Sequence, residues 1–447
     1  MSIHPLPSRA RFFACALFAV LVAATLVSAD PAPPPAITFH ALPEASYDAA
    51  ATVSGYATKV FLSGQPGTSA EDALRRLAGE LNALGLSPAN LANVRGSLLD
   101  TPDHPFSMAP WNAAWERLYA EPAPRATRTT VAAVALPGAN TRVVAEAVAA
   151  FHAEPEGSVP GRPSLNPFVR FHGEGAHGAS ASAIVLPGTA LFFSSGILAD
   201  PADPRAPENS VARFGSVAAQ TRSIFAKLED LLLREGFQWE DIFYVRGLLS
   251  PDPETGETDF AGFGETFEAH FPGRHPRLRP ALTIWSAPGF APTGRLVEVE
   301  IYAAAADGRG PFIRFDTDRA HPGLQMTGTE AARISSSGTV ARYQALTWFS
   351  GAIGTASDDL HEESISTLLT LLRRLRDLGL DFDATVHLRA YPVVGEAFSA
   401  KMGDWNQAYG RFFALPVNPH KPARTSFPVT ALPGQRAIEV EILAIGP

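Results

Sequence analysis

The sequence predicts three tandem units that each mix β-strands and α-helices in the same order. An apolar run ending in Ser-Gly recurs three times, at Ser63-Gly64, Ser195-Gly196 and Ser350-Gly351. A helical stretch, a short β-type run, a second helix and a final strand follow each copy. The length of 447 residues also suits about three domains. A repeat this long is a whole domain, because solenoid repeats span only about 20 to 50 residues.

Proline- and glycine-rich segments set the expected boundaries. We expect a stiff spacer at residues 30–35 and linkers at 154–167 and 306–311. The three units are therefore predicted over residues 36–153, 164–306 and 312–447, hereafter the first, second and third unit.

The first helix of each unit is predicted from apolar spacing and from a terminating glycine. In the third unit the apolar residues recur at spacings of three and four, which predicts one buried face. These residues are Ile365, Leu368, Leu369, Leu372, Leu375 and Leu378. Gly85, Gly236 and Gly379 are expected to end the three helices. The β-type runs that follow are expected at residues 93–99, 242–249 and 385–391.

The second helix and the last strand carry further repeated residues. Aromatic side chains four apart are expected to pack in the core, at Trp111 and Trp115, Phe263 and Phe267, and Trp405 and Tyr409. The final strand of the third unit alternates, with Ile438, Val440 and Ile442 on one face and Glu439 and Glu441 on the other. Two carboxylates on a buried strand call for a functional or structural partner.

The N-terminus is typical of an export signal. Arg9 and Arg11 precede an apolar stretch over residues 12–26, and small residues follow at 27–29. We expect residues 1–29 to be a cleavable signal peptide and the mature protein to be periplasmic or secreted, with a membrane anchor at residues 12–29 as the alternative. Cleavage would remove Cys15, the only cysteine, so the mature chain is expected to lack thiol chemistry, disulfides and cysteine metal ligands.

Composition disfavours two classes of partner. The net charge is −9 and there is no basic run, which argues against nucleic acid. His172 and His177 lie in a glycine-rich segment without a third ligand at a suitable spacing, so no metal site is predicted.

The third unit combines Ser-Gly after an apolar strand, an Asn before an aromatic on the second helix, Pro-x-Arg, Leu-Pro and a final strand of alternating Glu. In this chain these are Ser350-Gly351, Asn406, Pro422-Ala423-Arg424, Leu432-Pro433 and Ile438-Glu439-Val440-Glu441. These motifs resemble those of the reactive intermediate deaminase family, also called RidA or YjgF/UK114. The resemblance spans nearly the whole mature chain.

The resemblance implies a fold and a reaction. Each unit is expected to be an α+β, chorismate-mutase-like domain, a mixed sheet backed by two helices. The three units would form an intramolecular pseudo-trimer around a central barrel, as a monomer with ligands between units. The implied reaction is hydrolysis of small enamine or imine acids to keto acids and ammonia, without metal or organic cofactor.

The implied site residues differ between units. Arginine would bind the substrate carboxylate and glutamate would position water. The implied catalytic residues are Arg424 with Glu439 and Arg279 with Glu298. The implied substrate-binding residues are Ser350, Gly351, Asn406, Ser426, Ser195, Gly196, Arg128, Asn112, Ser63 and Gly64. The first unit has Val144 at the glutamate position and the second has Gly264 at the asparagine position, so the sites are expected to be unequal.

Two alternatives remain open at the level of sequence. The family's Gly-Pro-Tyr element is missing, since Tyr47 and Tyr343 stand at other spacings. The protein is therefore either an imine deaminase or a non-enzymatic periplasmic binding module for small carboxylates or keto acids. The structural alternative is that Arg424 and Glu439 form a salt bridge that holds units together.

Overall fold

The computed structural model divides the chain after Pro35, and residues 36–447 form one unit by themselves. It describes residues 35–40, 50–119, 125–152, 162–163, 168–172, 180–271, 279–290, 294–305, 324–327, 337–340, 343–394, 398–413 and 421–446. The predicted signal peptide, His177, Tyr47 and the 306–311 linker lie outside these residues. Among the described helices, none is both long and apolar enough to span a bilayer.

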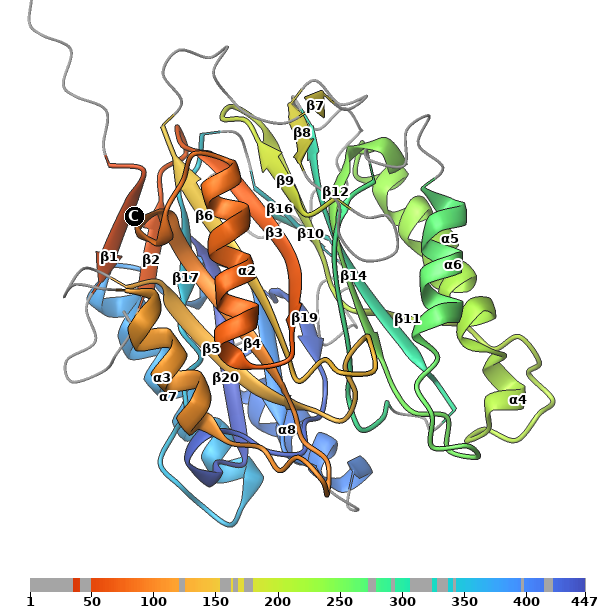
Figure 1. The fold of residues 1–447 in the computed structure, drawn as a ribbon. Coiled ribbons are helices and arrows are strands. Elements are labelled where there is room, and N and C mark those ends of the chain that lie inside the picture. The colour runs from red at the N-terminus through yellow and green to blue at the C-terminus, as the bar shows by residue number, and fades with distance from the viewer. Residues whose placement is uncertain are drawn as a thin grey trace, which may run out of the picture. The chain divides into compact units, whose positions relative to one another are not determined.

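The first sheet takes most of its strands from the first unit (Figure 1). Its order is β5-β4-β6-β3-β9-β8-β7. The strands are β3 (Thr58–Gly67), β4 (Leu91–Leu99), β5 (Thr127–Ala133), β6 (Val143–Phe151), β7 (Arg162–Pro163), β8 (Val169–His172) and β9 (Ser182–Val185). Helices α2 (Ala70–Ala83) and α3 (Met108–Leu118) back it, and the buried Trp111 and Trp115 belong to the core between them and the sheet.

The second sheet has the order β13-β12-β14-β10-β16-β15, with β11 added beside β14. Its strands are β10 (Ala190–Ser194), β11 (Ile197–Leu198), β12 (Ile242–Leu249), β13 (Ala281–Ser286), β14 (Val297–Ala305), β15 (Leu324–Thr327) and β16 (Ser337–Val340). Its helices are α4 (Val211–Phe214), α5 (Val217–Arg234) and α6 (Phe260–His270).

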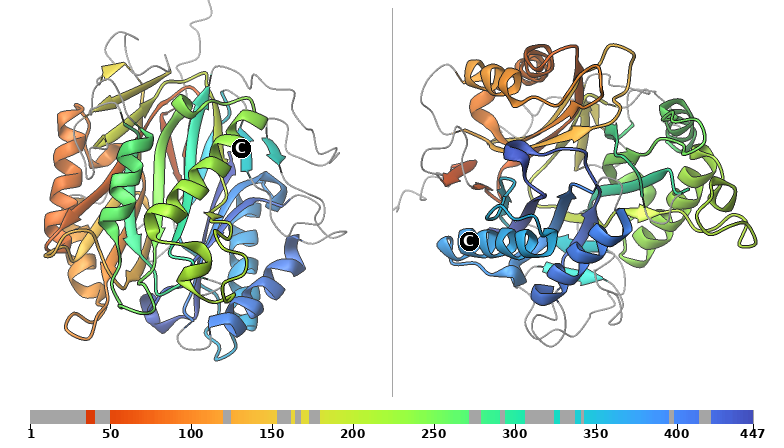
Figure 2. Two further views of the ribbon diagram at one scale, coloured as in Figure 1. Left: turned by 90° about the vertical axis from the view of Figure 1, so that its right-hand side faces the viewer. Right: turned by 90° about the horizontal axis from the view of Figure 1, so that it is seen from below.

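The third sheet has the order β1-β2-β17-β20-β18-β19. Its strands are β1 (Ile37–His40), β2 (Ala50–Val53), β17 (Leu346–Phe349), β18 (Thr385–Pro392), β19 (Ala423–Ser426) and β20 (Ile438–Ile445). Helices α7 (Leu360–Asp377) and α8 (Phe398–Phe413) pack on it, as Figure 2 shows. The described part thus has three mixed sheets and seven α-helices, which confirms the expected α+β class.

Each sheet ends in a hairpin contributed by the unit that follows it. The β8–β9 hairpin of the second unit pairs with β3, and the β15–β16 hairpin of the third unit pairs with β10. The β1–β2 hairpin of the first unit pairs with β17 of the third unit, so each of the three units gives a hairpin to another unit's sheet. Residues 54–57 link β2 to β3, and residues 186–189 link β9 to β10, so both links carry the chain from one sheet to the next. The sheets therefore cut across the predicted unit boundaries.

Several predicted details can be compared with these elements. Gly85, Gly236 and Gly379 follow α2, α5 and α7 with φ values of 74°, 79° and 73°, the left-handed conformation that favours glycine at a helix end. The three predicted β-type runs are β4, β12 and β18. All six helix aromatics are buried, as expected.

The predicted buried face of α7 is partly wrong. Leu368 and Leu375 are buried, but Leu369 is 44% exposed. The buried face instead includes Glu363, which accepts hydrogen bonds from the backbone N–H of Ser357 and of Ala437. A buried polar residue such as Glu363 is stable on this face because its hydrogen bonds are satisfied, and the spacing of apolar residues does not predict such a position.

Candidate functional site

Strand register identifies the equivalent residues of the three units. In each unit an arginine on a central strand stands opposite a threonine on one side and a glutamate on the other. These sets are Arg95 with Thr129 and Glu146, Arg246 with Thr283 and Glu300, and Arg389 with Thr425 and Glu441. The residues one position before the three threonines are therefore equivalent, namely Arg128, Leu282 and Arg424. The residues two positions before the three glutamates are also equivalent, namely Val144, Glu298 and Glu439.

The third and first units meet at what we call the 3/1 junction. The backbone N–H of Arg128 donates to Oγ of Ser350 at 3.0 Å, and the N–H of Gly351 donates to the carbonyl of Arg128 at 3.2 Å. The Arg128 guanidinium lies over the ring of Trp115, 5.3 Å from its centre. The carboxylate of Glu439 lies against Gly351, where a Cβ would collide with Oε1. Glycine is therefore required for the glutamate to approach the backbone.

The second and third units repeat this arrangement at the 2/3 junction. The backbone N–H of Arg424 donates to Oγ of Ser195 at 2.8 Å. Its guanidinium donates to Oδ1 of Asn406 at 2.8 Å and lies 4.4 Å from the ring centre of Tyr409. Glu298 lies against Gly196, and a Cβ there would collide with Oε1 of Glu298. Both junctions therefore combine an arginine of one unit with a Ser-Gly and a glutamate of the preceding unit.

Burial changes the acidity of both junction glutamates. Burial and the nearby Glu441 raise the pKa of Glu439 to about 8, against the opposing pull of Arg128 and Arg374. Burial and Glu300 raise the pKa of Glu298 to about 8, against Arg424 and Arg295. A carboxyl group with such a pKa can both donate and accept a proton near neutral pH.

The 1/2 junction keeps the scaffold without the charges. The backbone N–H of Leu282 donates to Oγ of Ser63 at 2.8 Å, as the arginines do elsewhere. The side chain of Val144 lies against Gly64, where the other junctions have glutamate. Leu282 and Val144 are 3% and 2% exposed. Arginine and glutamate have thus both been replaced by apolar residues at this junction.

Several sequence-derived assignments need correction. Arg279 does not occupy the arginine position: its Nε donates to the carbonyl of Phe271 at 2.9 Å and its guanidinium lies 3.4 Å from Glu268. Leu282 occupies that position instead. Arg424 and Glu439 belong to different junctions, so neither a joint site nor a salt bridge between them describes the structure.

The other predicted substrate-binding residues can also be placed in the structure. Asn112 is exposed on α3, whereas Asn406 does hold its arginine. Ser426 accepts a hydrogen bond from Nε1 of Trp405 at 2.9 Å, within its own unit. The hydroxyls of Ser63, Ser195 and Ser350 tie strands of different units together, which gives them a structural task besides any ligand contact.

A buried ring of charges, which the sequence analysis missed, joins all three units. Arg95 bonds Glu441 at 2.6 Å and Glu146 at 3.3 Å. Arg246 bonds Glu146 and Glu300, and Arg389 bonds Glu300 at 2.9 Å and Glu441 at 3.2 Å. Arginine and glutamate therefore alternate around a closed circuit. The repeated Val-Arg-Gly at residues 94–96 and 245–247 was the signal that could have revealed it.

The ring glutamates behave oppositely to the junction glutamates. Burial alone would raise the pKa of Glu441, but the guanidinium groups of Arg95 and Arg389 lower it to about 2. The pKa of Glu300 is likewise well below its usual range, because Arg389 and Arg246 outweigh burial. The ring is therefore ionised near neutral pH, and three arginines balance three glutamates.

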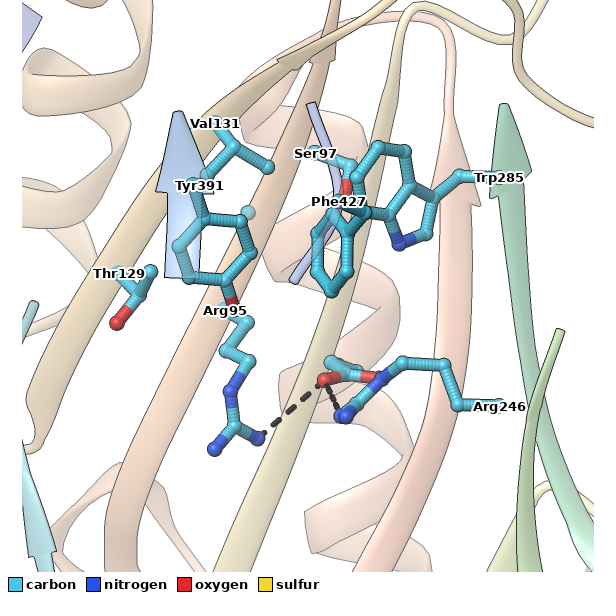
Figure 3. A pocket seen from close by; sticks show the side chains of 10 residues that line it. Arg95, Ser97, Thr129, Val131, Arg246, Trp285, Tyr391 and Phe427 are labelled. Carbon is cyan, nitrogen blue, oxygen red and sulfur yellow. Dashed lines mark hydrogen bonds and ion pairs between the residues drawn. The ribbon is translucent and has the colours of Figure 1, made fainter. Parts of the chain in front are cut away.

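A small pocket opens onto this ring (Figure 3). Arg95, Arg246 and Glu146 form its polar floor, and Trp285, Tyr391 and Phe427 supply aromatic walls. The room inside is only about 20 Å³, which suits one or two water-sized occupants rather than an amino-acid-sized ligand. A substrate of the expected class would have to bind elsewhere.

Metal-binding groups do not gather in the described ranges, where no three His, Cys, Asp or Glu residues form a cluster. His172, one of the two histidines of the glycine-rich segment, is the last residue of β8, and its Nδ1 lies 2.7 Å from a carboxylate oxygen of Glu80.

Comparison with known proteins gives matches in structure. No protein-family model and no curated protein matches the sequence. A solved YjgF-family protein of Neisseria meningitidis is 17% identical, and the match covers 28% of this chain and 95% of that one with a TM-score of 0.20. A YjgF/YER057c/UK114-family protein of Mycobacterium tuberculosis is 19% identical over 27% of this chain and 98% of its own, also with a TM-score of 0.20. Escherichia coli TdcF, solved with bound serine, is 18% identical over 23% and 81%, with a TM-score of 0.20. Parts of this chain are thus similar to solved YjgF/UK114-family structures.

Proposed function

We propose that the protein hydrolyses small enamine or imine acids at its 3/1 and 2/3 junctions, releasing keto acids and ammonia. The observation that carries this proposal is the repeated pairing of a buried glutamate, whose pKa is raised to about 8, with an arginine of the next unit. The enzyme would be a monomeric pseudo-trimer, with the charge ring at its centre. The reaction needs no cofactor, because the substrate carries its own reactive carbon–nitrogen bond.

The arginine would bind the substrate carboxylate. A guanidinium offers two parallel N–H donors to a carboxylate, which favours a fixed orientation. Arg424 is already held by Asn406 and by the ring of Tyr409, so little side-chain freedom is lost on binding. Arg128 is similarly held over Trp115 at the other junction.

The glutamate would move the protons. Near neutral pH most of a carboxyl group with a pKa of about 8 is protonated, so Glu439 or Glu298 can donate its proton to an enamine carbon and form the imine. The resulting carboxylate can take a proton from water as the water oxygen bonds to the imine carbon. The carboxyl group then returns this proton to the amino nitrogen, and as the carbon–nitrogen bond breaks the new hydroxyl gives its proton back to the carboxylate, so ammonia leaves and the keto acid remains.

Catalysis can be tested with imino acids generated in situ by an amino-acid oxidase, by measuring keto-acid release. We expect the double variant Glu439→Gln with Glu298→Gln to lose about 10²- to 10⁴-fold in rate, the usual contribution of acid–base catalysis. Arg279→Ala is the matched control, because Arg279 lies outside both junctions, and it should keep the rate. Release equal to the uncatalysed rate in the unaltered protein would refute the proposal.

The number of sites gives a second test. Calorimetry with 2-oxobutanoate should give two equivalents per chain, since the 1/2 junction has Leu282 and Val144 in place of the charged pair. Leu282→Arg combined with Val144→Glu should raise this to three. Two equivalents without turnover would instead support the alternative, a non-enzymatic binding module for small carboxylates. No binding would refute both.

Export is a separate proposal. The predicted signal peptide at residues 1–29 would place the mature protein in the periplasm or outside the cell. Mass spectrometry of the protein isolated from its host should find an N-terminus near Asp30. Recovery of the full chain with the membrane fraction would favour the anchor at residues 12–29 instead.

A further inference from the structure

We propose that the substrates of the 3/1 and 2/3 junctions are imino acids with a second carboxylate in the side chain, a proposal that rests on the imine hydrolysis proposed for these junctions. Each junction glutamate lies within electrostatic reach of two arginines, one from the next unit and one from its own unit. The arginine of the next unit would bind the α-carboxylate. The arginine of the same unit, hereafter the second arginine, would bind the other carboxylate. It is Arg374 at the 3/1 junction and Arg295 at the 2/3 junction.

At the 3/1 junction the second arginine reaches the Ser-Gly turn. Nη1 of Arg374 on α7 donates to the carbonyl of Ser350 at 3.1 Å. The next residue, Gly351, is the one against which the Glu439 carboxylate lies. Arg128 reaches the same turn from the first unit, through its backbone N–H to Oγ of Ser350. Both arginines therefore contact the turn against which the glutamate packs.

At the 2/3 junction the second arginine comes from the start of the last strand. Arg295 lies three residues before Glu298, and its guanidinium lies 5.0 Å from the ring centre of Phe214 on α4. Burial lowers the pKa of Arg295, and the attraction of Asp200 and Glu298 does not make up for this. Asp200 is itself bonded by Lys227 at 2.7 Å. A further anion beside Arg295 would therefore stabilise its charged form.

The two second arginines occupy different places in their units. Counting back from the glycine that ends the first helix, the place of Arg374 holds the buried Leu231 in the second unit. Counting back from the junction glutamate, the place of Arg295 holds Arg436 in the third unit. There, Arg374 rather than Arg436 is the arginine of the same unit with the largest effect on Glu439. Two positions that are not equivalent thus supply the same charge, which points to a requirement of the site rather than of the scaffold.

The first unit provides an internal comparison. The 1/2 junction has Leu282 and Val144 instead of the charged pair, and the two places of the second arginine hold Glu80 and Thr141 there. Glu80 accepts a hydrogen bond from the hydroxyl of Ser182 at 2.9 Å. The junction that has neither the first arginine nor the glutamate therefore has no cation at either of these places.

The glutamates alone do not explain two arginines per junction. With a pKa of about 8, most of Glu439 and of Glu298 is uncharged near neutral pH. A ligand with one carboxylate would neutralise one guanidinium, whereas a ligand with two would neutralise both. A guanidinium has several N–H donors, so it can bond a backbone carbonyl, as Arg374 does, and a carboxylate at the same time. The charges therefore favour a dicarboxylate.

Two matched ligands test the preference. 2-Oxopentanedioate and 2-oxopentanoate have carbon chains of the same length and differ in the second carboxylate. Calorimetry should show that the unaltered protein binds 2-oxopentanedioate about 10- to 100-fold more tightly, the usual effect of a hydrogen-bonded charge. Arg374→Met combined with Arg295→Met should remove this preference and leave the affinity for 2-oxopentanoate unchanged. Arg373→Met should keep the preference, because Arg373 is exposed and its hydrogen bonds stay within α7.

Turnover gives the same comparison for substrates. Oxidases that act on glutamate and on norvaline generate 2-iminopentanedioate and 2-iminopentanoate in situ. The double variant should raise KM for 2-iminopentanedioate by about 10- to 100-fold with kcat unchanged, as expected when a remote binding contact is lost, and should leave KM for 2-iminopentanoate unchanged.

The outcomes separate this proposal from the function on which it rests. Equal affinity of the unaltered protein for the two keto acids would overturn the dicarboxylate preference and leave imine hydrolysis standing, and this comparison needs no variant. An equal loss of affinity for both ligands in the double variant would do the same. Binding of neither keto acid would overturn both proposals.

Discussion

The raised pKa of Glu439 predicts a stability that depends on pH with an unusual sign. The pKa rises from an ordinary 4.5 to about 8, mainly because the carboxyl group is buried. Folding therefore favours the protonated form. The stability associated with this protonation is complete below pH 4.5 and is lost as the pH rises through 8.

The size of the effect follows from these two values. At 1.36 kcal/mol per pH unit, the change from 4.5 to about 8 corresponds to about 5 kcal/mol in total. About 3 kcal/mol of this falls between pH 5.5 and pH 8.5. Glu439→Gln keeps the size and the neutral character of the side chain but cannot ionise, so this variant should lose about 3 kcal/mol less over that interval than the unaltered protein.

Urea unfolding followed by tryptophan fluorescence at the two pH values provides the measurement. Glu441→Gln is a matched control from the same strand, and its sign is opposite. Because the pKa of Glu441 is lowered to about 2, its stabilising effect is present above pH 4.5 and is lost as the pH falls toward 2, so Glu441→Gln should destabilise equally at pH 5.5 and 8.5. If Glu439→Gln and the unaltered protein lost stability in parallel, the reasoning about a buried neutral carboxyl group would be refuted.

Three other predictions concern the ring, a glycine and the exchanged hairpin. Arg389→Met should lower the free energy of unfolding by about 3 to 5 kcal/mol, because it leaves buried carboxylates without one of their partners. Arg376→Met breaks an exposed ion pair and should lower the free energy of unfolding by less than about 1 kcal/mol in the same urea titration. Gly351→Ala should reduce keto-acid release at the 3/1 junction by displacing Glu439, and Gly79→Ala, which meets no atom within 4 Å, should leave release unchanged. Deleting residues 1–53 should expose the edge of β17, so hydrogen exchange of the Trp348 amide should accelerate relative to that in the full chain.

Elements with strong local signals were predictable from the sequence. Gly379 ends α7 because only a residue tolerant of positive φ fits there, and that requirement is visible in the sequence. The alternation of residues 438–442 likewise predicted which face of β20 is apolar. Both depend on a residue's own backbone or on its nearest neighbours along the chain.

The residue of the second unit that is equivalent to Arg128 and Arg424 was assigned wrongly, because the assignment followed the spacing between arginines. Arg279 lies near the expected distance from Arg128 and Arg424, but the pairing of β12 with β13 aligns Leu282 with them. Matching Pro280 with Pro422 would have given the correct register. An apolar residue at the arginine position carries no chemical signal, so only its structural equivalence reveals it.

The sharing of each site between units could not be read from one unit. Arg424 and Glu439 stand in the same unit, but they face different neighbours, Glu298 and Arg128. The exchange of hairpins has no local signal either. A strand such as β9 has the same alternation whichever sheet it joins.

The hairpin exchange also constrains the order in which the chain can fold. Residues 37–53 are made early, but their partner strand β17 begins at residue 346. The first sheet can be completed once residue 185 is available, and the second once residue 340 is available. The third sheet must wait for the C-terminal strand β20. Its contacts span nearly the whole polypeptide, which makes its formation the slowest step that topology imposes. A nascent chain therefore carries an unpaired N-terminal hairpin until synthesis is almost finished.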